Sequence, residues 1–234
     1  MIYKKMLKQQ IISGNEKISR MKDKIISLAG ILGDSRGFSE KCLKHSDILA
    51  VAREDTDIIG FSLARNSVSS KIRGTMFFAT RILPEYQNQR LGSALVSLIL
   101  KEGIKKQGIN LLKPYYFVTG TAHPIVYAAF SRKLKLIPSI YGNLRPSRID
   151  KEVARVFAET FSPELYFDPD NFIIRKAFSD SAEFFEKDRI PWAKEESVNN
   201  FFEKRLNLGK KEGNMLVILA KIPKLWQIRE RFFG

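Results

Sequence analysis

The segment ILPEYQNQRLGS occupies residues 82–93 and joins two stretches of opposite character. Before it, residues 74–83 are rich in aromatic and β-branched side chains, as β-strands are, and Pro84 ends the run. After it, apolar residues recur at helical spacing from 91 to 106, and Gly108 closes that helix. The segment is therefore predicted to lead from a strand into a helix.

This loop has the properties of an anion-binding site. Backbone N–H groups at a helix N-terminus have no partner within the helix, and the helix dipole favours negative charge there. Gly92 carries no side chain where a phosphate would need to approach the backbone closely. Gln89 and Arg90 add side-chain donors suited to phosphate oxygens. An ordinary strand-to-helix turn with one glycine is the alternative interpretation.

The residues before the loop predict three or four further elements. Residues 4–12 are expected to form a first strand or the start of a helix. Apolar residues at three- and four-residue steps predict an amphipathic helix over 15–31, capped by Asn15 and ended by Gly30 or Gly33. Two short apolar runs, 48–52 and 58–64, flank a charged turn at 55–57 and predict a hairpin.

The residues after the loop predict further strands and helices, in a less regular order. Two of the expected helices have a recognisable N-terminus: one has Pro124 in its first turn, and the other is capped by Asp150. The expected strands are 115–119, 172–178 and 214–222, and the expected helices are 124–133, 151–160 and 197–208.

Composition restricts the class of protein. A hydrophobic fraction of 44% with 17 Phe suffices for a packed core. Cys42 is the one cysteine, so no internal disulfide can form, as is typical of a reducing compartment. No stretch approaches the roughly 20 apolar residues of a membrane span, and the N-terminal residues lack the apolar run of a signal peptide. We therefore expect a cytoplasmic protein with no membrane partner.

The net charge is strongly positive. Forty Lys and Arg against 25 Asp and Glu give +15, and such a field attracts nucleic acid or a phosphorylated cofactor. The basic residues are spread along the chain, in pieces such as 131–135 and 208–213, and form no basic stripe interleaved with aromatics. A nucleic-acid partner therefore rests on charge alone.

Together with its flanking elements, the loop resembles the pyrophosphate loop of GNAT acyltransferases. The family pattern is a Val-x-Pro-like strand end followed by Gln/Arg-x-x-Gly-x-Gly/Ala. Residues 82–84 match the strand end, and Gln87 and Gly92 match the loop and helix start. In this register Arg90 stands where the pattern has its first glycine. A register shifted by two, beginning at Gln89, fits the pattern literally and uses the same amides.

The resemblance extends over about residues 48–136 and implies a fold. The expected class is α/β (α+β): a GNAT-like mixed, strongly twisted sheet of about six to seven strands flanked by helices, with a C-terminal elaboration. We expect one GNAT-like acyltransferase domain over residues 1–234. Its core and acyl-CoA site should lie within about 1–137, and the elaboration with the last strands within about 138–234.

The resemblance also implies a cofactor, acetyl-CoA or another acyl-CoA. In the family two neighbouring parallel strands splay apart, and the pantetheine arm lies in the gap, hydrogen-bonded to strand backbone. In this chain the backbone of Thr80, Ile82 and Leu83 would take that role. The pyrophosphate would lie on the N–H groups of Gln87, Asn88, Gln89, Arg90, Leu91, Gly92 and Ser93.

The implied reaction is direct attack of an amine on the thioester, with a base taking the amine proton and an acid protonating the thiolate. The family's acid is often a tyrosine on the helix that falls here within 121–130, TAHPIVYAAF. If His123-Pro124 aligns with the family's Asn-Pro, the tyrosine position is Phe130, which cannot donate a proton. Tyr127, three residues earlier on roughly the same helix face, is the acid candidate, with a core-packed tyrosine as the alternative.

The same segment resembles an unassigned subset of GNAT-like proteins that carry Thr-x-Asn-Pro-x-Val-Tyr, from which His123 departs. His123 is a candidate base because the unperturbed pKa of histidine lies near 6.5, or else a helix cap or packing residue. Glu85, beside the cofactor loop, is a second candidate base or a solvated loop residue. No spacing of His, Cys and carboxylates resembles a metal site.

Three functional hypotheses follow. The first is an N-acyltransferase that moves an acetyl or similar group from acyl-CoA to a primary amine of a small molecule or protein. The second is a GNAT-shaped CoA-binding or regulatory module without chemistry, motivated by Arg90 and Phe130 at the positions of a glycine and a tyrosine. The third is a basic nucleic-acid-binding protein.

Overall fold

The computed structural model describes residues 7–87, 89–108, 113–141, 145–178, 190–208 and 212–223. These residues form two compact units. In its described parts, unit 1 takes residues 7–67 and 75–108, and unit 2 takes residues 68–74 and 113–223.

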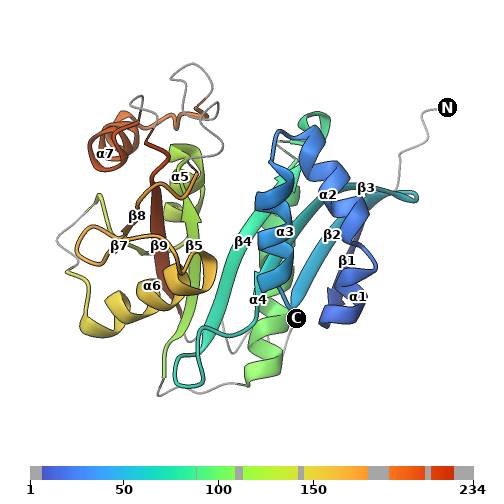
Figure 1. Cartoon of the computed structure of the whole chain (residues 1–234), viewed down its shortest axis with the longest axis horizontal. Helices are drawn as coiled ribbons and strands as arrows, with labels where there is room; N and C mark the ends of the chain where they lie inside the picture. The colour runs from blue at the N-terminus through green and yellow to red at the C-terminus, as the bar shows by residue number, and fades with distance from the viewer. Residues whose placement is uncertain are drawn as a thin grey trace. The chain divides into compact units, whose positions relative to one another are not determined.

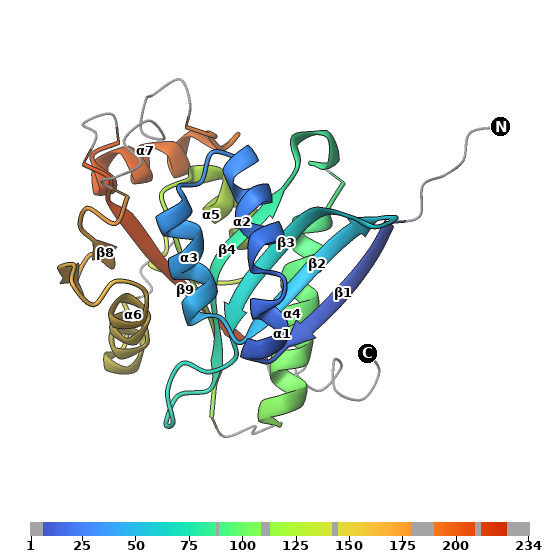
Figure 2. The same cartoon turned by 45° about the vertical axis from the view of Figure 1, so that its right-hand side comes forward.

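Unit 1 is an antiparallel sheet with helices on both faces (Figure 1). Its strands, in spatial order, are β1 (Leu7–Ser13), β2 (Ile48–Glu54), β3 (Asp57–Arg65) and β4 (Gly74–Ile82). Its helices are α1 (Asn15–Ser19), α2 (Lys22–Ile31), α3 (Arg36–His45) and α4 (Leu91–Gln107), with a 3-10 turn η1 (Pro84–Tyr86). Helices α2 and α3 cover one face and α4 the other (Figure 2). Because both faces are covered, β2 and β3 are continuous apolar runs that are buried along most of their length.

The predicted hairpin is confirmed, and the predicted first helix is corrected. Strands β2 and β3 pair antiparallel, and Asp55 at their tip has a left-handed backbone with φ 52°. The single helix expected over 15–31 is two helices, α1 and α2, interrupted at residues 20–21. Asn15 lies inside α1 and does not cap it, because the residue at the cap is Gly14. Of the two predicted terminators it is Gly33, with φ 86°, that follows the end of α2.

Helix α3 was not predicted from the sequence. Its buried residues are few, Ser39, Cys42 and Leu43, and only one of them is a large apolar residue, so the segment lacks a strong apolar stripe. The start is well defined because the side chain of Ser35 accepts a hydrogen bond from the Phe38 N–H at 3.2 Å.

Unit 2 is built around its last strand. The strands are β5 (Tyr115–Thr121), β6 (Leu136–Ile137), β7 (Phe167–Asp168), β8 (Ile173–Ile174) and β9 (Met215–Ile222), and the helices are α5 (Pro124–Ser131), α6 (Arg148–Phe161) and α7 (Glu196–Leu206). Residues 216–222 of strand β9 pair antiparallel with β5, and β9 also pairs with the short strands β6 and β8. It is buried at every position but Lys221, as the apolar run 214–222 predicts.

Two predicted features of unit 2 are wrong in detail. The strand expected over 172–178 is only the two-residue β8, because Phe172 and Lys176 both have positive φ and break the extended backbone. The cap of α6 is Ser147 and not Asp150, which is the third residue of the helix in a capping box with Ser147.

The predicted fold class, sheet strands flanked by helices, is confirmed. Among the described residues six strands have seven to nine residues, in line with the six to seven predicted. The three additional strands have two residues each, too few to leave a periodic signal in the sequence. The single-domain organisation stays a prediction. None of the described helices combines the length and the apolarity that crossing a membrane requires.

A buried carboxylate stabilises unit 2. Asp150 is 2% exposed and accepts hydrogen bonds from the Tyr116 hydroxyl at 3.1 Å and from the Ser147 hydroxyl at 2.7 Å. Lys221 Nζ lies 3.0 Å from its Oδ1. Burial by itself would raise the pKa of Asp150, but the bonds from Ser147 and Lys221 outweigh burial and hold that pKa below its ordinary value.

We expect Asp150→Asn to lower the free energy of unfolding at pH 7 by about 2–3 kcal/mol, because it weakens hydrogen bonds to a buried charge. Since the carboxyl pKa is lower in the folded than in the unfolded state, this stabilisation is complete above about pH 4 and is lost as the pH falls through the folded-state value. Denaturant titrations at pH 7 and pH 3 measure it, with exposed Asp170→Asn as the control. An equal loss at both pH values would contradict a role for the charge.

Candidate functional site

The loop between β4 and α4 is held by short-range backbone bonds. The Leu83 N–H donates to the Ile59 carbonyl at 2.9 Å, which extends the β3–β4 pairing by one residue beyond the strand. The turn η1 follows, and the Gln87 N–H donates to the Pro84 carbonyl at 3.1 Å. The predicted cofactor residue Asn88 lies outside the described residues. The chain then enters α4 at Leu91.

Arg90, the residue at the N-terminal cap of α4, has a left-handed backbone, φ 62° and ψ 9°. A left-handed residue followed by a right-handed helical one turns successive N–H groups toward one point, an arrangement known to bind anions. The Ala94 N–H donates to the Arg90 carbonyl at 3.0 Å, the first bond of the helix. Within the described residues, nothing accepts a hydrogen bond from the N–H groups of Leu91, Gly92 or Ser93. Three backbone donors are therefore available at this helix end.

Gly92 is not required by the fold. Its φ is not positive, and a Cβ added there would approach Thr80 Cγ2 at 3.7 Å and Ile82 Cγ1 at 3.9 Å, which are ordinary contacts. Glycine within a helix is less stable than alanine by about 0.5–1 kcal/mol. A glycine that neither the backbone nor the packing needs is consistent with a ligand that approaches this turn closely.

The end of β4 presents backbone groups away from β3. Leu83 bonds to Ile59, so by antiparallel alternation the backbone groups of Thr80 and Ile82 point to the other side of β4. Their carbonyls accept from side chains of unit 1: Arg81 Nη1 donates to the Thr80 carbonyl at 3.0 Å, and Gln87 Nε2 to the Ile82 carbonyl at 3.1 Å. The side chains of Thr80 and Ile82 face the first turn of α4.

Arg81 joins this strand end to the segment between α2 and α3. Its guanidinium makes a two-point contact with Asp34, Nε to Oδ2 and Nη2 to Oδ1, both at 2.8 Å. The Asp34 side chain is 7% exposed and that of Arg81 32%, so the pair is shielded from water. Sequence reasoning missed this pair, because nothing in the local pattern connects residues 47 positions apart.

The other polar side chains of the loop make local contacts. Gln89 Nε2 donates to the Glu85 carbonyl at 3.3 Å, so both glutamines predicted to bind phosphate also brace the loop. Glu85 itself, a candidate base, is exposed on η1. The Tyr86 hydroxyl donates to Glu54 Oε2 at 2.6 Å, a contact that the sequence did not predict.

The other two candidate catalytic residues belong to unit 2. His123 is the residue at the N-terminal cap of α5, and its backbone N–H donates to Thr121 Oγ1 at 3.0 Å. The Tyr127 ring is 1% exposed. Its hydroxyl donates to the Pro138 carbonyl at 2.9 Å and accepts from the Ile140 N–H at 3.1 Å. Burial raises the pKa of Tyr127. Its role as general acid stays a prediction.

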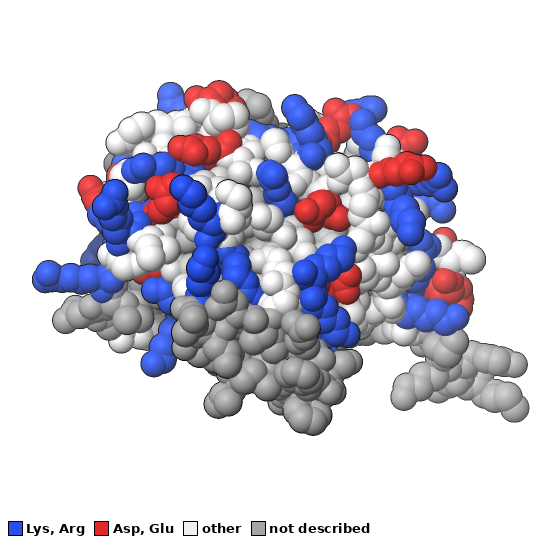
Figure 3. Space-filling view, turned by 90° about the horizontal axis from the view of Figure 1, so that it is seen from below, with Lys and Arg blue, Asp and Glu red and all other residues white. Residues whose placement is uncertain are grey.

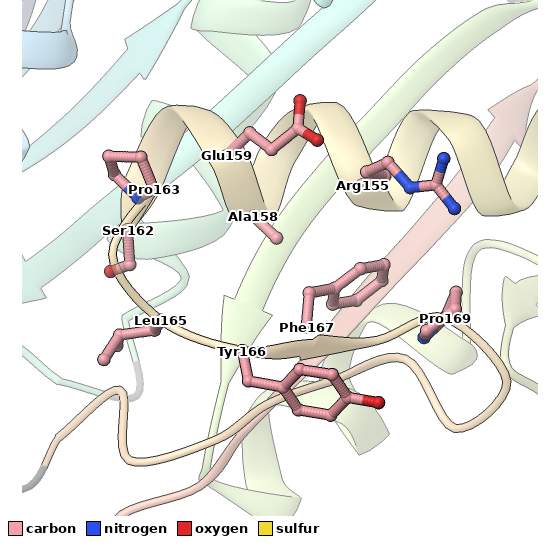
Figure 4. Close-up of a pocket in the computed structure, with 9 residues that line it drawn as sticks. All are labelled: Arg155, Ala158, Glu159, Ser162, Pro163, Leu165, Tyr166, Phe167 and Pro169. Carbon is pink, nitrogen blue, oxygen red and sulfur yellow. The ribbon is translucent and has the colours of Figure 1, made fainter.

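The described residues offer little support for a nucleophilic cysteine or for a metal site. Burial raises the pKa of Cys42 to about 12, so its thiol is a poor nucleophile. Among the residues that the structure describes, no cluster of His, Cys, Asp and Glu could hold a metal ion. A hollow of about 350 Å³ lies in unit 2 beside the C-terminal turns of α6 (Figure 4). None of the predicted site residues lines it.

The surface charge has no single-sign patch on the face that can be seen. Figure 3 shows Lys and Arg interspersed with Asp and Glu across the visible described surface. Among the described residues several charged side chains form ion pairs, for example Arg36 with Glu40 and Arg132 with Glu195. This distribution matches the even spread of basic residues along the sequence.

No family model matches the sequence. No curated protein matches it either.

Solved acetyltransferase structures align with the chain at low similarity. An IAA acetyltransferase from Bacillus cereus is 11% identical, over 93% of this chain and 100% of that chain, with a TM-score of 0.48. A GNAT family acetyltransferase from Elizabethkingia anophelis with acetyl-CoA bound is 12% identical, over 92% and 98%, with a TM-score of 0.43. An aminoglycoside 6'-N-acetyltransferase complexed with coenzyme A is 20% identical, over 48% and 61%, with a TM-score of 0.37. TM-scores below 0.5 transfer neither an activity nor a set of site residues to this chain.

We expect Arg90→Gly to raise the free energy of unfolding by about 0.5–1 kcal/mol, because glycine adopts the left-handed backbone without the Cβ clash. Lys105→Gly, in the exposed last turns of α4, is the matched control and should lower it by about 1 kcal/mol. Chemical denaturation compares the two variants. If Arg90→Gly is instead less stable than the wild type, the arginine side chain stabilises the turn by more than the left-handed backbone conformation destabilises it.

We expect Tyr127→Phe to lower the free energy of unfolding by about 1–3 kcal/mol, because the Pro138 carbonyl and the Ile140 N–H lose their buried partner. The control is Tyr166→Phe, whose ring is 68% exposed, and its effect should stay below about 0.5 kcal/mol. The same variant decides the acid role once turnover is measurable: an unchanged rate would remove it.

Proposed function

We propose that this chain is an acyl-CoA-dependent N-acyltransferase that transfers an acetyl or similar acyl group to a primary amine. The observation that carries the proposal is Gly92, a glycine that neither backbone nor packing requires, placed among three N–H groups with no acceptor among the described residues. A phosphate or diphosphate is an anion of the kind that binds such a group of donors at a helix N-terminus. Coenzyme A carries a diphosphate between its adenosine and pantetheine parts.

The end of β4 supports the same ligand class. The backbone groups of Thr80 and Ile82 point away from β3, so they take no part in the β3–β4 pairing. A pantetheine arm carries amide N–H and C=O groups that can pair with strand backbone in the manner of an added strand. A diphosphate on the first turn of α4 and an amide arm along the end of β4 would belong to one molecule.

The reaction that we propose needs no covalent enzyme intermediate. The neutral amine nitrogen attacks the thioester carbonyl, a new C–N bond forms, and the C–S bond breaks. A base takes one proton from the nitrogen, and an acid returns a proton to the thiolate, so that the products are an amide and free CoA. Glu85 and His123 are the candidate bases, and Tyr127 is the candidate acid.

A second candidate function is CoA binding without acyl transfer. It is favoured by the contacts of the acid candidate, Tyr127, and of Phe130, which stands at the family's tyrosine position. The Tyr127 hydroxyl already has a donor and an acceptor in the backbone of unit 2, and the Phe130 ring packs against Phe117 with centroids 4.6 Å apart. This candidate predicts the same affinity for CoA but no release of thiol from acetyl-CoA with any amine of a broad panel.

The test of CoA binding is Gly92→Ala. The added methyl group should stabilise the helix by about 0.5–1 kcal/mol, because alanine is the better helix former and its contacts to Thr80 and Ile82 are ordinary. The same methyl group would occupy the position that a phosphate oxygen needs, so calorimetry should give a CoA affinity at least about tenfold weaker than that of the wild type.

Gly30→Ala is the matched control for this experiment. Gly30 lies in α2, and a Cβ there meets nothing within 4 Å, so the variant should gain similar stability and keep wild-type CoA affinity. Equal CoA affinity of Gly92→Ala and the wild type would contradict a diphosphate at this turn. A wild-type protein that binds no CoA at millimolar concentration would refute the proposed function itself.

A further inference from the structure

One side-chain bond ties the proposed phosphate loop to a different element of unit 1. The hydroxyl of Tyr86, the last residue of η1, donates to Oε2 of Glu54, the last residue of β2, at 2.6 Å. The distance is that of a charge-assisted hydrogen bond, and the contact is partly shielded from water. Both residues are partly buried, so the bond competes with water less than an exposed contact would.

Two other side-chain bonds of the described loop residues span only a few positions. Gln87 Nε2 donates to the carbonyl of Ile82, the last residue of β4, and Gln89 Nε2 to the carbonyl of Glu85, so neither reaches a strand other than the one that the loop leaves. The backbone bond of Leu83 to Ile59 lies at the strand end, before η1 begins. Tyr86 therefore supplies an anchor between that strand end and the first turn of α4.

We propose that the Tyr86–Glu54 bond is a positioning contact for anion binding: it holds η1 on the β2–β3 hairpin and so keeps the N–H groups of residues 91–93 directed at one point. This inference rests on the proposed function, because it assumes that a diphosphate is the ligand. The physical reason is preorganisation. Ordering a mobile loop on binding costs binding free energy. A loop that is already in its binding conformation avoids this cost, whereas a loop released at η1 does not.

The carboxylate of Glu54 also brings a negative charge to the loop. The Tyr86 hydroxyl that donates to one of its oxygens is itself neutral, so the charge remains and would weaken the binding of a diphosphate. A neutral amide at position 54 would keep an acceptor for that hydroxyl while removing the charge, which separates the bond from the charge experimentally.

The experiment is calorimetric titration of the full chain with CoA. Tyr86→Phe and Glu54→Ala should each bind CoA about five- to tenfold more weakly than the wild type. The double variant should bind no more than about twofold more weakly than either single variant, because both substitutions remove the same bond. Glu54→Gln should bind at least about threefold more tightly than Glu54→Ala. Tyr166→Phe, an exposed tyrosine of unit 2, is the control and should leave the affinity unchanged.

A second measurement separates positioning from loss of stability. Amide hydrogen exchange without ligand should become faster in Tyr86→Phe for residues 84–93, with little change in β2 and β3. If Tyr86→Phe fails to fold, the comparison of Glu54→Gln with Glu54→Ala still decides, since Glu54 lies at the partly exposed end of its strand.

The outcomes distinguish the two proposals. If the wild-type protein binds no CoA, the proposed function fails. If the wild type binds CoA and Tyr86→Phe binds it as tightly, only the positioning role fails. Two further results would overturn the positioning role. They are losses of CoA affinity that add in the double variant, and a Glu54→Gln variant that binds CoA as weakly as Glu54→Ala. Each would mean that the Tyr86–Glu54 bond does not determine the affinity.

Discussion

The chain has to turn from the end of β4 into α4 within residues 83–90, and the left-handed backbone of Arg90 completes that turn. The helix therefore begins at Leu91 with its first N–H groups directed into the loop. A non-glycine residue pays about 1 kcal/mol or more for this conformation. Arg90 stands at the position where the GNAT loop pattern has its first glycine. The backbone strain therefore lies in the same turn that the sequence analysis identified.

The strand end and the loop are stabilised by contacts that converge from distant parts of unit 1. Asp34 holds Arg81, whose Nη1 in turn covers the Thr80 carbonyl. Glu54 holds Tyr86 at the other end of the same short stretch. Each contact joins the β4–α4 connection to a separate element, so the geometry of the connection depends on the packing of the whole unit.

Unit 2 has a different character. Its polar side chains are engaged internally: Asp150 gathers Tyr116, Ser147 and Lys221, and Tyr127 bonds to two backbone groups. Buried polar groups that are fully paired make a fold specific, and releasing one of them costs more than the bond is worth in water. The Tyr127 hydroxyl is one such paired group. As a general acid it would have to give its proton to a thiolate, whereas the binding-only hypothesis leaves it bonded within unit 2.

Local patterns in the sequence were sufficient for elements whose signal is contained in a few neighbouring residues. The strand–loop–helix connection at 74–107, the hairpin at 48–65 and the last strand were predicted because apolar periodicity and turn residues act over short range. The break within 15–31, helix α3 and the capping box of Ser147 are local features that the sequence analysis did not predict. The tertiary structure decided what depends on long-range contact: the Arg81–Asp34 and Tyr86–Glu54 pairs. Residues 47 and 32 positions apart meet only because strand register and helix packing bring them together, and no local spacing records that geometry.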